Sequence, residues 1–194
     1  MKAAYKSLIP IILIFILSNE GITQTKFERE YGINKTEAPK KAVDFIDSCN
    51  FSKKINWYAE ESQDGKTFEA KTKHRNHKFS IEFDNYGVLL DVEQKVDFDE
   101  LDESVKTSIS KTIGDLFTTY KVRKTQIQWT GKSKGLMDLI KNGRSDKPYT
   151  TQYEIIVDAR KDGFSSYYEV LLDSSGNPLE VLEIKQPNAD NLVF

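Results

Sequence analysis

The chain has little of the chemistry that proteins use for cross-linking or metal binding. Its 194 residues include one cysteine, Cys49, and two histidines, His74 and His77. A lone cysteine cannot close a disulfide within the chain, so the hydrophobic core has to hold the fold. Cys49 could be a nucleophile or a dimer bridge, but its place on a helical apolar stripe favours a small buried residue. The histidines are expected to flank a turn, and neither a metal nor another cofactor is predicted.

The sequence also lacks the motifs of common catalytic and nucleotide-binding sites, because it has no G-x-S-x-G and no glycine-rich phosphate loop. The formal net charge is only −2, and the 28 basic and 30 acidic residues are interspersed. Such a balance indicates no nucleic-acid partner. We therefore expect a protein that is not an enzyme. A hydrolase with dispersed acidic residues is the alternative, and a cleft with two carboxyls of strongly shifted pKa would favour it.

Long hydrophobic runs are absent except for residues 8–17. This run is too short for a membrane-spanning helix, which needs roughly 20 residues. Lys2 and Lys6 precede it, and the small residues Gly21 and Thr23 follow, in the order typical of a signal peptide. The alternative is a buried N-terminal strand or helix. We predict a signal peptide at residues 1–23 and a periplasmic or secreted protein with no transmembrane segment after cleavage.

What the sequence does have is alternation between helical and strand-like hydrophobic spacing. One helix is predicted near residues 36–50, and a second opens at Asp99 and runs to about residue 120. Each precedes four predicted strands, which are antiparallel where short turns join them. The strands are residues 55–60, 68–72, 79–83 and 88–96, and then 122–129, 149–158, 164–173 and 178–185. Residues 25–35 are expected to be a loosely held polar lead-in, and residues 186–194 a tail.

The two halves match residue by residue around one turn, at a constant offset that takes Asp84 to Asp173. The matching positions are Phe79, Ile81, Phe83, Asp84, Gly87, Leu90 and Val92 with Tyr168, Val170, Leu172, Asp173, Gly176, Leu179 and Val181. Two unrelated hairpins with similar turn chemistry are the alternative. A constant offset through a strand, a D-x-x-G turn and the next strand favours a repeat. We predict an α+β fold of two tandem α-β-β-β-β units, residues 24–97 and 98–194, with antiparallel sheets and the helices packed on one sheet face.

The second half also carries a pattern with a known counterpart. The pattern is Tyr153-Glu154-Ile155-Ile156-Val157, then Tyr168-Glu169-Val170-Leu171-Leu172-Asp173, then Gly176 and Leu179-Glu180-Val181. It resembles the end of a PepSY-like domain, and residues 79–92 resemble it more loosely. The tandem arrangement behind a signal peptide is similar to PepSY-like proteins with the β-lactamase-inhibitor-protein-like (BLIP-like) fold. This resemblance implies a curved antiparallel sheet with helices on one face, and binding or inhibition of other proteins in place of catalysis.

The strand faces predict where a partner would bind. The side away from the helices should be polar if it is solvated. The first half obeys this rule, with Asn56, Glu60, Glu69, Lys71, Ser80 and Glu82. The second half instead places an apolar patch there, which could meet a protein partner or pack against another part of the chain. The patch consists of Ile156, Tyr167, Leu171 and Leu182.

The long connection at residues 131–148 is the second predicted binding element. A short amphipathic helix is expected within it, formed by Leu136, Met137, Leu139 and Ile140. Long loops on a rigid sheet often carry binding, but this one could equally cover the core as a flap. The predicted function is an exported, non-catalytic protein that binds, and could inhibit, another protein. The alternative is a carrier of a small amphiphile held between sheet and helices.

Overall fold

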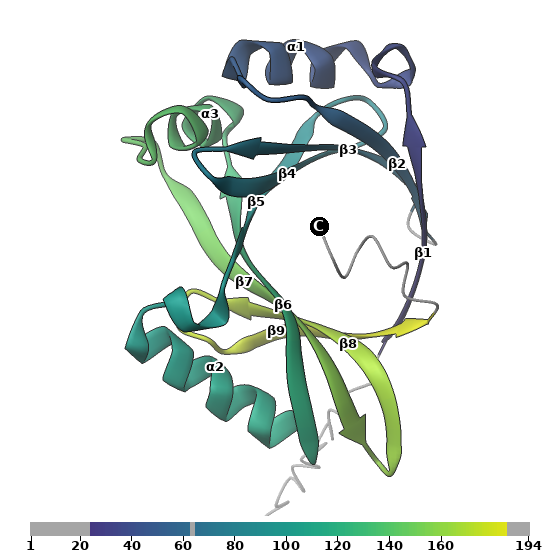
Figure 1. The fold of residues 1–194 in the computed structure, drawn as a ribbon, viewed down its shortest axis with the longest axis vertical. Coiled ribbons are helices and arrows are strands. Elements are labelled where there is room, and N and C mark those ends of the chain that lie inside the picture. The colour runs from purple at the N-terminus through teal and green to yellow at the C-terminus, as the bar shows by residue number, and fades with distance from the viewer. Residues whose placement is uncertain (1–23, 63–64, 186–194) are drawn as a thin grey trace, which may run out of the picture.

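The computed structural model describes residues 24–62 and 65–185. Within them, nine strands form one sheet that closes on itself in chain order, and three helices lie outside the ring (Figure 1). Neighbouring strands are antiparallel except β1 and β9, which are parallel. The sequence left open whether the two half-sheets are continuous, and they join through β5 and β6. The predicted signal peptide and tail lie outside the described residues.

The elements follow one another in a simple order. They are β1 (Gln24–Ile33), the 3₁₀ turn η1 (Lys35–Glu37), α1 (Lys40–Cys49), β2 (Asn56–Ser62), β3 (Gly65–His74), β4 (His77–Phe83), β5 (Leu89–Val96), the 3₁₀ turn η2 (Phe98–Glu100), α2 (Glu103–Leu116), β6 (Thr119–Gly131), α3 (Ser133–Asn142), β7 (Tyr149–Lys161), β8 (Phe164–Asp173) and β9 (Pro178–Lys185). A 3₁₀ turn, a helix and four strands therefore occur twice, and the short helix expected within residues 131–148 is α3. No helix among the described residues is long and apolar enough to span a membrane.

β1 is the strand that the sequence did not reveal. A loose lead-in was expected at residues 25–35, and this was wrong, because β1 pairs with β2 on one side and with β9 on the other. Its polar composition hid it from a search for hydrophobic alternation. Glu30 illustrates the reason, since its carboxylate contacts Lys71 on a polar inner face. Strand pairing at both edges defines this element, and its outer face adds Tyr31 and Ile33, which pack partly buried against the core.

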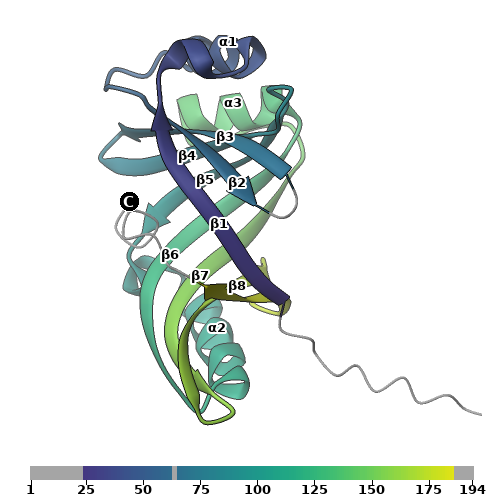
Figure 2. The same ribbon diagram turned by 90° about the vertical axis from the view of Figure 1, so that its right-hand side faces the viewer.

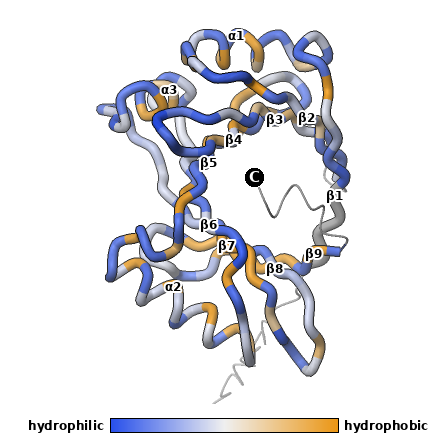
Figure 3. The backbone as a smooth tube through the Cα atoms, viewed as in Figure 1, coloured by the Kyte–Doolittle hydropathy of each residue, from blue (hydrophilic) through white to orange (hydrophobic). Residues whose placement is uncertain are grey.

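The hydrophobic core lies on the outer face of the ring, in two clusters at opposite ends of the molecule (Figure 2). α1 and α3 cover β2 to β5 at one end, and α2 covers β7 and β8 at the other. α1 buries Ala42, Ile46 and Cys49, whose spacing of three and four residues places them on one side of a helix. The alternation of hydrophobic and hydrophilic residues along helices and strands is visible in Figure 3.

The second helix is shorter than the sequence indicated. Asp97 and Glu100 form a capping box around η2, so the chain makes a separate 3₁₀ turn before α2 begins at Glu103. At the other end, Phe117 already has extended backbone geometry, and β6 follows. Asp99, where the helix was predicted to open, lies inside η2, whereas Asp97 is the N-cap of η2 and Asp102 that of α2.

The turn after β4 locks α1 onto the sheet. Asp84 accepts hydrogen bonds from the backbone N–H groups of Tyr86 and Val88, both at 2.8 Å. Gly87 has a φ of +75°, and a Cβ there would lie 2.9 Å from the Ala42 backbone nitrogen. The turn therefore needs glycine both for its backbone conformation and for its contact with α1.

The turn after β8 repeats this arrangement against α2. Asp173 accepts hydrogen bonds from the backbone of Ser175 at 2.8 Å and of Asn177 at 2.9 Å. Gly176 has a φ of +82°, and a Cβ there would lie 2.8 Å from Ser108 Oγ. The D-x-x-G sequence in each half thus marks a turn that packs closely against a helix.

These contacts predict that Gly87→Ala destabilises the protein more than Gly163→Ala. Both glycines have positive φ, but a Cβ at Gly163 would meet nothing within 4 Å. We expect a loss of about 1 kcal/mol for Gly163→Ala from backbone strain alone, and about 2–4 kcal/mol for Gly87→Ala, which adds overpacking. Urea unfolding curves of both variants test this. Equal losses would show that contact with α1 does not require glycine.

Candidate functional site

The inner face of the ring carries a polar network that continues from strand to strand. Directly paired residues of neighbouring strands point to the same face, and the pairs Lys71–Ser80 and Ser80–Glu93 lie on the side away from the helices. More than six carboxyl groups belong to this face, Glu60 and Glu169 among them, and we call six of them the inner acidic cluster. They are Glu30, Glu69, Glu82, Asp91, Glu93 and Glu154.

Lys71 is the cation at one end of this network. Its Nζ lies 2.7 Å from Glu30 Oε2 and 3.0 Å from Glu69 Oε2, and it sits 4.8 Å from the ring centre of Tyr58. Ser80 donates a hydrogen bond to the other oxygen of Glu69. Since the Lys71 side chain is only 5% exposed, its charge depends on these partners.

Asp91, Glu93 and two glutamines form the centre of the network. Gln126 Nε2 donates to Glu93 Oε2 at 2.6 Å, and Gln128 Nε2 lies 3.4 Å from Glu93 Oε1 and 3.5 Å from Asp91 Oδ2. Glu93 also shares a hydrogen bond with Glu154, which lies 3.8 Å from Lys124. Two buried acceptors, Asp91 Oδ1 and Gln126 Oε1, receive no hydrogen bond from the described residues.

Burial and mutual repulsion disfavour ionisation of these carboxyls. Burial raises the pKa of Glu69 to about 8, with Lys71 opposing the rise and Glu30 adding to it. Burial, followed by repulsion from Glu93, raises the pKa of Asp91 well above its usual range. Burial also raises the pKa of Glu93, although Lys124 opposes it. Burial therefore opposes ionisation of these carboxyls, even though Lys71, Lys95 and Lys124 lie on the same face.

The arrangement offers hydrogen-bond acceptors in place of metal coordination. Among the described residues, no three His, Cys, Asp or Glu side chains gather in a way that could hold a metal ion. The sequence reading of this face as solvated was wrong, because Lys71 and Ser80 are each only 4% exposed. The sequence shows acidic residues at alternate positions of consecutive strands, but this pattern does not distinguish an enclosed face from a solvated one.

The predicted apolar patch lies on the same inner face as the acidic cluster. Leu171 pairs directly with Glu154, and Ile156 and Leu182 both pair with Glu169. Ile156 is buried at 2% exposure, whereas Tyr167, Leu171 and Leu182 are half-buried. The structure thus brings the four predicted patch residues to one face, where they adjoin the carboxyls.

The two predicted loop residues lie elsewhere, on α3 at the outer face. Leu136 is fully buried in the core under α1, and Met137 packs partly buried against the same core. α3 therefore acts as the core-covering segment that the sequence offered as the alternative to a binding loop. Leu136 presents no exposed side chain to a partner.

The other candidates for chemistry are structural. Cys49 is 2% exposed in the α1 core, and burial raises its thiol pKa to about 12, so it does not form a reactive thiolate. His74 is the last residue of β3, and His77 is the first residue of β4. The two turn residues between them, Arg75 and Asn76, have positive φ. The His74 ring packs at 5.4 Å from Phe51 and 6.2 Å from Phe79.

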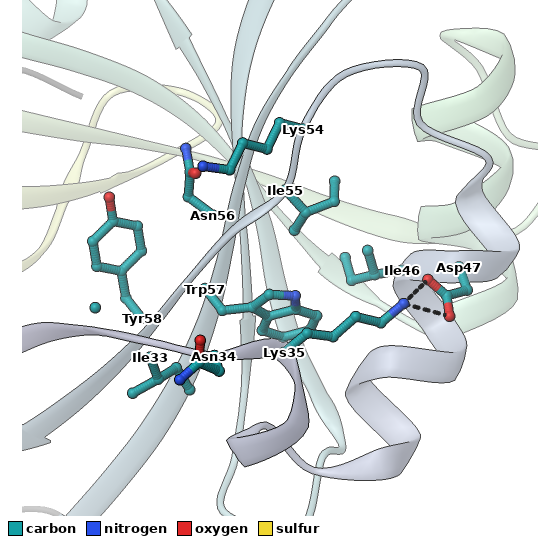
Figure 4. Close-up of a pocket in the computed structure, with 11 residues that line it drawn as sticks. Ile33, Asn34, Lys35, Ile46, Asp47, Lys54, Ile55, Asn56, Trp57 and Tyr58 are labelled. Atoms are coloured by element: carbon teal, nitrogen blue, oxygen red, sulfur yellow. Dashed lines mark hydrogen bonds and ion pairs between the residues drawn. The ribbon is translucent and has the colours of Figure 1, made fainter.

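A separate groove of about 670 Å³ opens between α1 and the ends of β1 and β2 (Figure 4). Its apolar wall consists of Ile33, Ile46, Ile55 and Trp57. An ion pair joins Lys35 Nζ to Asp47 Oδ1 at 2.7 Å on one side of the groove, and Lys54 adds a second cation. The groove is therefore amphiphilic, and none of the inner acidic cluster lines it.

Comparisons with known proteins support the fold alone. No protein-family model matches the chain, and no curated protein matches it. A crystal structure of a DUF2874 family protein from Bacteroides ovatus ATCC 8483 resembles it with a TM-score of 0.51 and 14% sequence identity. The match covers 75% of this chain and 87% of that one. The similarity supports a mixed fold of helices on an antiparallel sheet.

The raised carboxyl pKa values predict that stability falls as the pH rises. Between the ordinary value of 4.5 and about 8, the unfolded chain loses the Glu69 proton while the folded chain retains it. Ionisation therefore favours the unfolded chain increasingly across this window, and the free energy of unfolding decreases. In Glu69→Gln the decrease should be shallower, as measured by urea unfolding from pH 5 to 9.

Asp115→Asn is the control for this experiment, since Asp115 is exposed on α2. Its pH dependence should match that of the parent protein. A Glu69→Gln protein with an unchanged slope would show that Glu69 does not keep its proton in the folded state.

Proposed function

We propose that the protein is an exported, non-catalytic binding module that holds a protein partner on the inner face of its closed sheet. The observation that carries the proposal is the continuity of this face, where the half-buried Leu171 directly adjoins Glu154. An apolar surface beside unusually concentrated polar groups is characteristic of recognition sites. Because the face is concave, a partner would insert a protruding or extended segment.

Binding explains the carboxyl groups better than catalysis does. Shifted carboxyl pKa values are also a property of hydrolases. Here, however, the carboxyls form hydrogen bonds with Ser80, Gln126 and Gln128, so they belong to a network of hydrogen-bonded side chains. We therefore assign these groups to holding a ligand.

The tandem architecture and the cellular location belong to the same proposal. We infer that residues 24–97 and 98–194 are two copies of one PepSY-like, BLIP-like unit that follow a signal peptide at residues 1–23, which directs the protein to the periplasm or the medium. The recurring order of 3₁₀ turn, helix and four strands supports this, as do the matching turns at Gly87 and Gly176. β1 and α3 are additions to the repeated unit.

The binding proposal predicts that Tyr167→Asp combined with Leu171→Asp abolishes partner capture. Both residues are half-buried on the inner face, and an aspartate there would add a charge beside existing carboxyls. The mature protein and the variant are used to capture partners from the envelope fraction, after circular dichroism has shown equal folding.

Phe164→Asp is the matched control, because Phe164 is 78% exposed at the turn between β7 and β8. It should retain the partner. If the double variant folds and captures the same partner as the parent protein, the inner face is not the binding surface.

A second function, carriage of a small amphiphile, is favoured by the α1 groove. Its apolar wall and its two lysines suit a ligand with a hydrocarbon body and one negative charge. In this reading, Ile46 and Trp57 contact the hydrocarbon chain, and Lys54 lies near the head group.

Carriage predicts that dodecanoate changes the fluorescence of Trp57 saturably in a Trp129→Phe background. Lys54→Glu should weaken binding by about threefold or more, as expected for an exposed charge pair. Lys121→Glu, an exposed change on β6, should leave the affinity unchanged. Absence of a saturable signal would eliminate the groove as a carrier site.

A further inference from the structure

The inner acidic cluster has an excess of acceptors that its own donors do not satisfy. Asp91 Oδ1 and Gln126 Oε1 are both buried and receive no hydrogen bond from the described residues. Gln126 is 3% exposed and uncharged. Repulsion between neighbouring carboxyls therefore does not explain why its Oε1 receives no hydrogen bond. Unsatisfied buried acceptors are costly, and they indicate that a donor belongs near them.

The charge of the same region specifies a cationic donor. Lys71 contacts Glu30 and Glu69 at one end, Lys124 lies 3.8 Å from Glu154 at the other, and Lys95 lies on the same face opposite Gln126. Between them, Asp91 and Glu93 receive amide donors from Gln126 and Gln128. An added ammonium or guanidinium group would supply both positive charge and N–H donors, as charge-assisted hydrogen bonds require.

The opposite side of the ring has different chemistry. β3 to β5 contribute carboxyls, and β8 and β9 contribute Tyr167, Leu171 and Leu182 interleaved with Glu169 and Glu180. Figures 1 and 2 show β4 and β8 on opposite sides of the ring. An extended chain directs alternate side chains to opposite sides. A segment that alternates basic and apolar residues would therefore match both sides at once.

We propose that the inner acidic cluster receives the basic side chains of an extended partner segment, whose apolar side chains rest on Tyr167, Leu171 and Leu182. This rests on the proposed function, because it names the chemistry of a partner bound at that same face. Asp91 Oδ1 and Gln126 Oε1 accept hydrogen bonds from the inserted cation. An inserted cation would favour the ionised forms of Asp91 and Glu93, which burial otherwise disfavours, and the resulting charge pairs favour a basic segment over a neutral one.

Binding of three capped pentapeptides and of spermidine to the full mature protein tests the proposal by calorimetry. The peptides alternate leucine with lysine, glutamine or glutamate. The lysine peptide should bind at least tenfold more tightly than the glutamine peptide and than spermidine, and the glutamate peptide should bind most weakly. Equal binding of spermidine and the lysine peptide would overturn the proposal in favour of a simple polyamine site.

Asp91→Asn with Glu93→Gln should weaken binding of the lysine peptide tenfold or more. This variant retains hydrogen-bonding side chains at both positions and removes the carboxyls that would ionise beside the cation, so it is expected to fold. Asp115→Asn with Glu103→Gln, an equal loss of charge on the exposed side of α2, is the control and should bind as the parent protein does.

The outcomes separate this inference from the function on which it rests. Equal binding of the lysine and glutamine peptides, unaffected by the Asp91 and Glu93 changes, would overturn the basic preference while leaving the inner face as a binding surface. No binding of any peptide by the folded protein would overturn both.

Discussion

The pairing of β1 with β9 is the contact on which the rest of the structure depends. Without it, the nine-stranded sheet would have two free edges, and its inner face would be an ordinary polar surface in contact with water. With it, the sheet closes, and that face becomes an interior. Closure moves charged side chains such as Lys71 into a low-exposure environment where each needs a partner. The polar network is the consequence.

The two faces of the sheet therefore have opposite chemistry and opposite roles. The outer face provides cohesion, because α1, α2 and α3 bury apolar side chains against it in two clusters. The inner face concentrates carboxyls whose pKa values are raised by burial. Groups arranged in this way reduce the stability of the isolated protein near neutral pH, as is common where structure is adapted to a ligand.

The agreement between the halves has a physical basis in their turns. Asp84 and Asp173 each accept two backbone N–H groups, and Gly87 and Gly176 each lie against a helix. Since these contacts combine positive φ with close approach, the D-x-x-G spacing was readable in the sequence. The inner acidic cluster was not readable, because alternate polar residues on a strand are the same whether the face meets water or closes upon itself. The four apolar residues expected on that face do share it, and alternation along the strands places Glu154 and Glu169 beside them.

The sequence by itself determined the local elements of this protein. Period-two and helical spacing identified the strands β2 to β9, the three helices and the burial of Cys49, because each depends only on nearby side chains and their periodicity. The tertiary structure decided what no local pattern contains. Pairing at both edges made β1 a strand. The fold also placed Glu30 beside Lys71 and the side chain of Leu136 in the hydrophobic core. Closure of the sheet depends on the pairing of its first and last strands. These strands are far apart in the chain, so the local sequence of either one does not indicate that they pair.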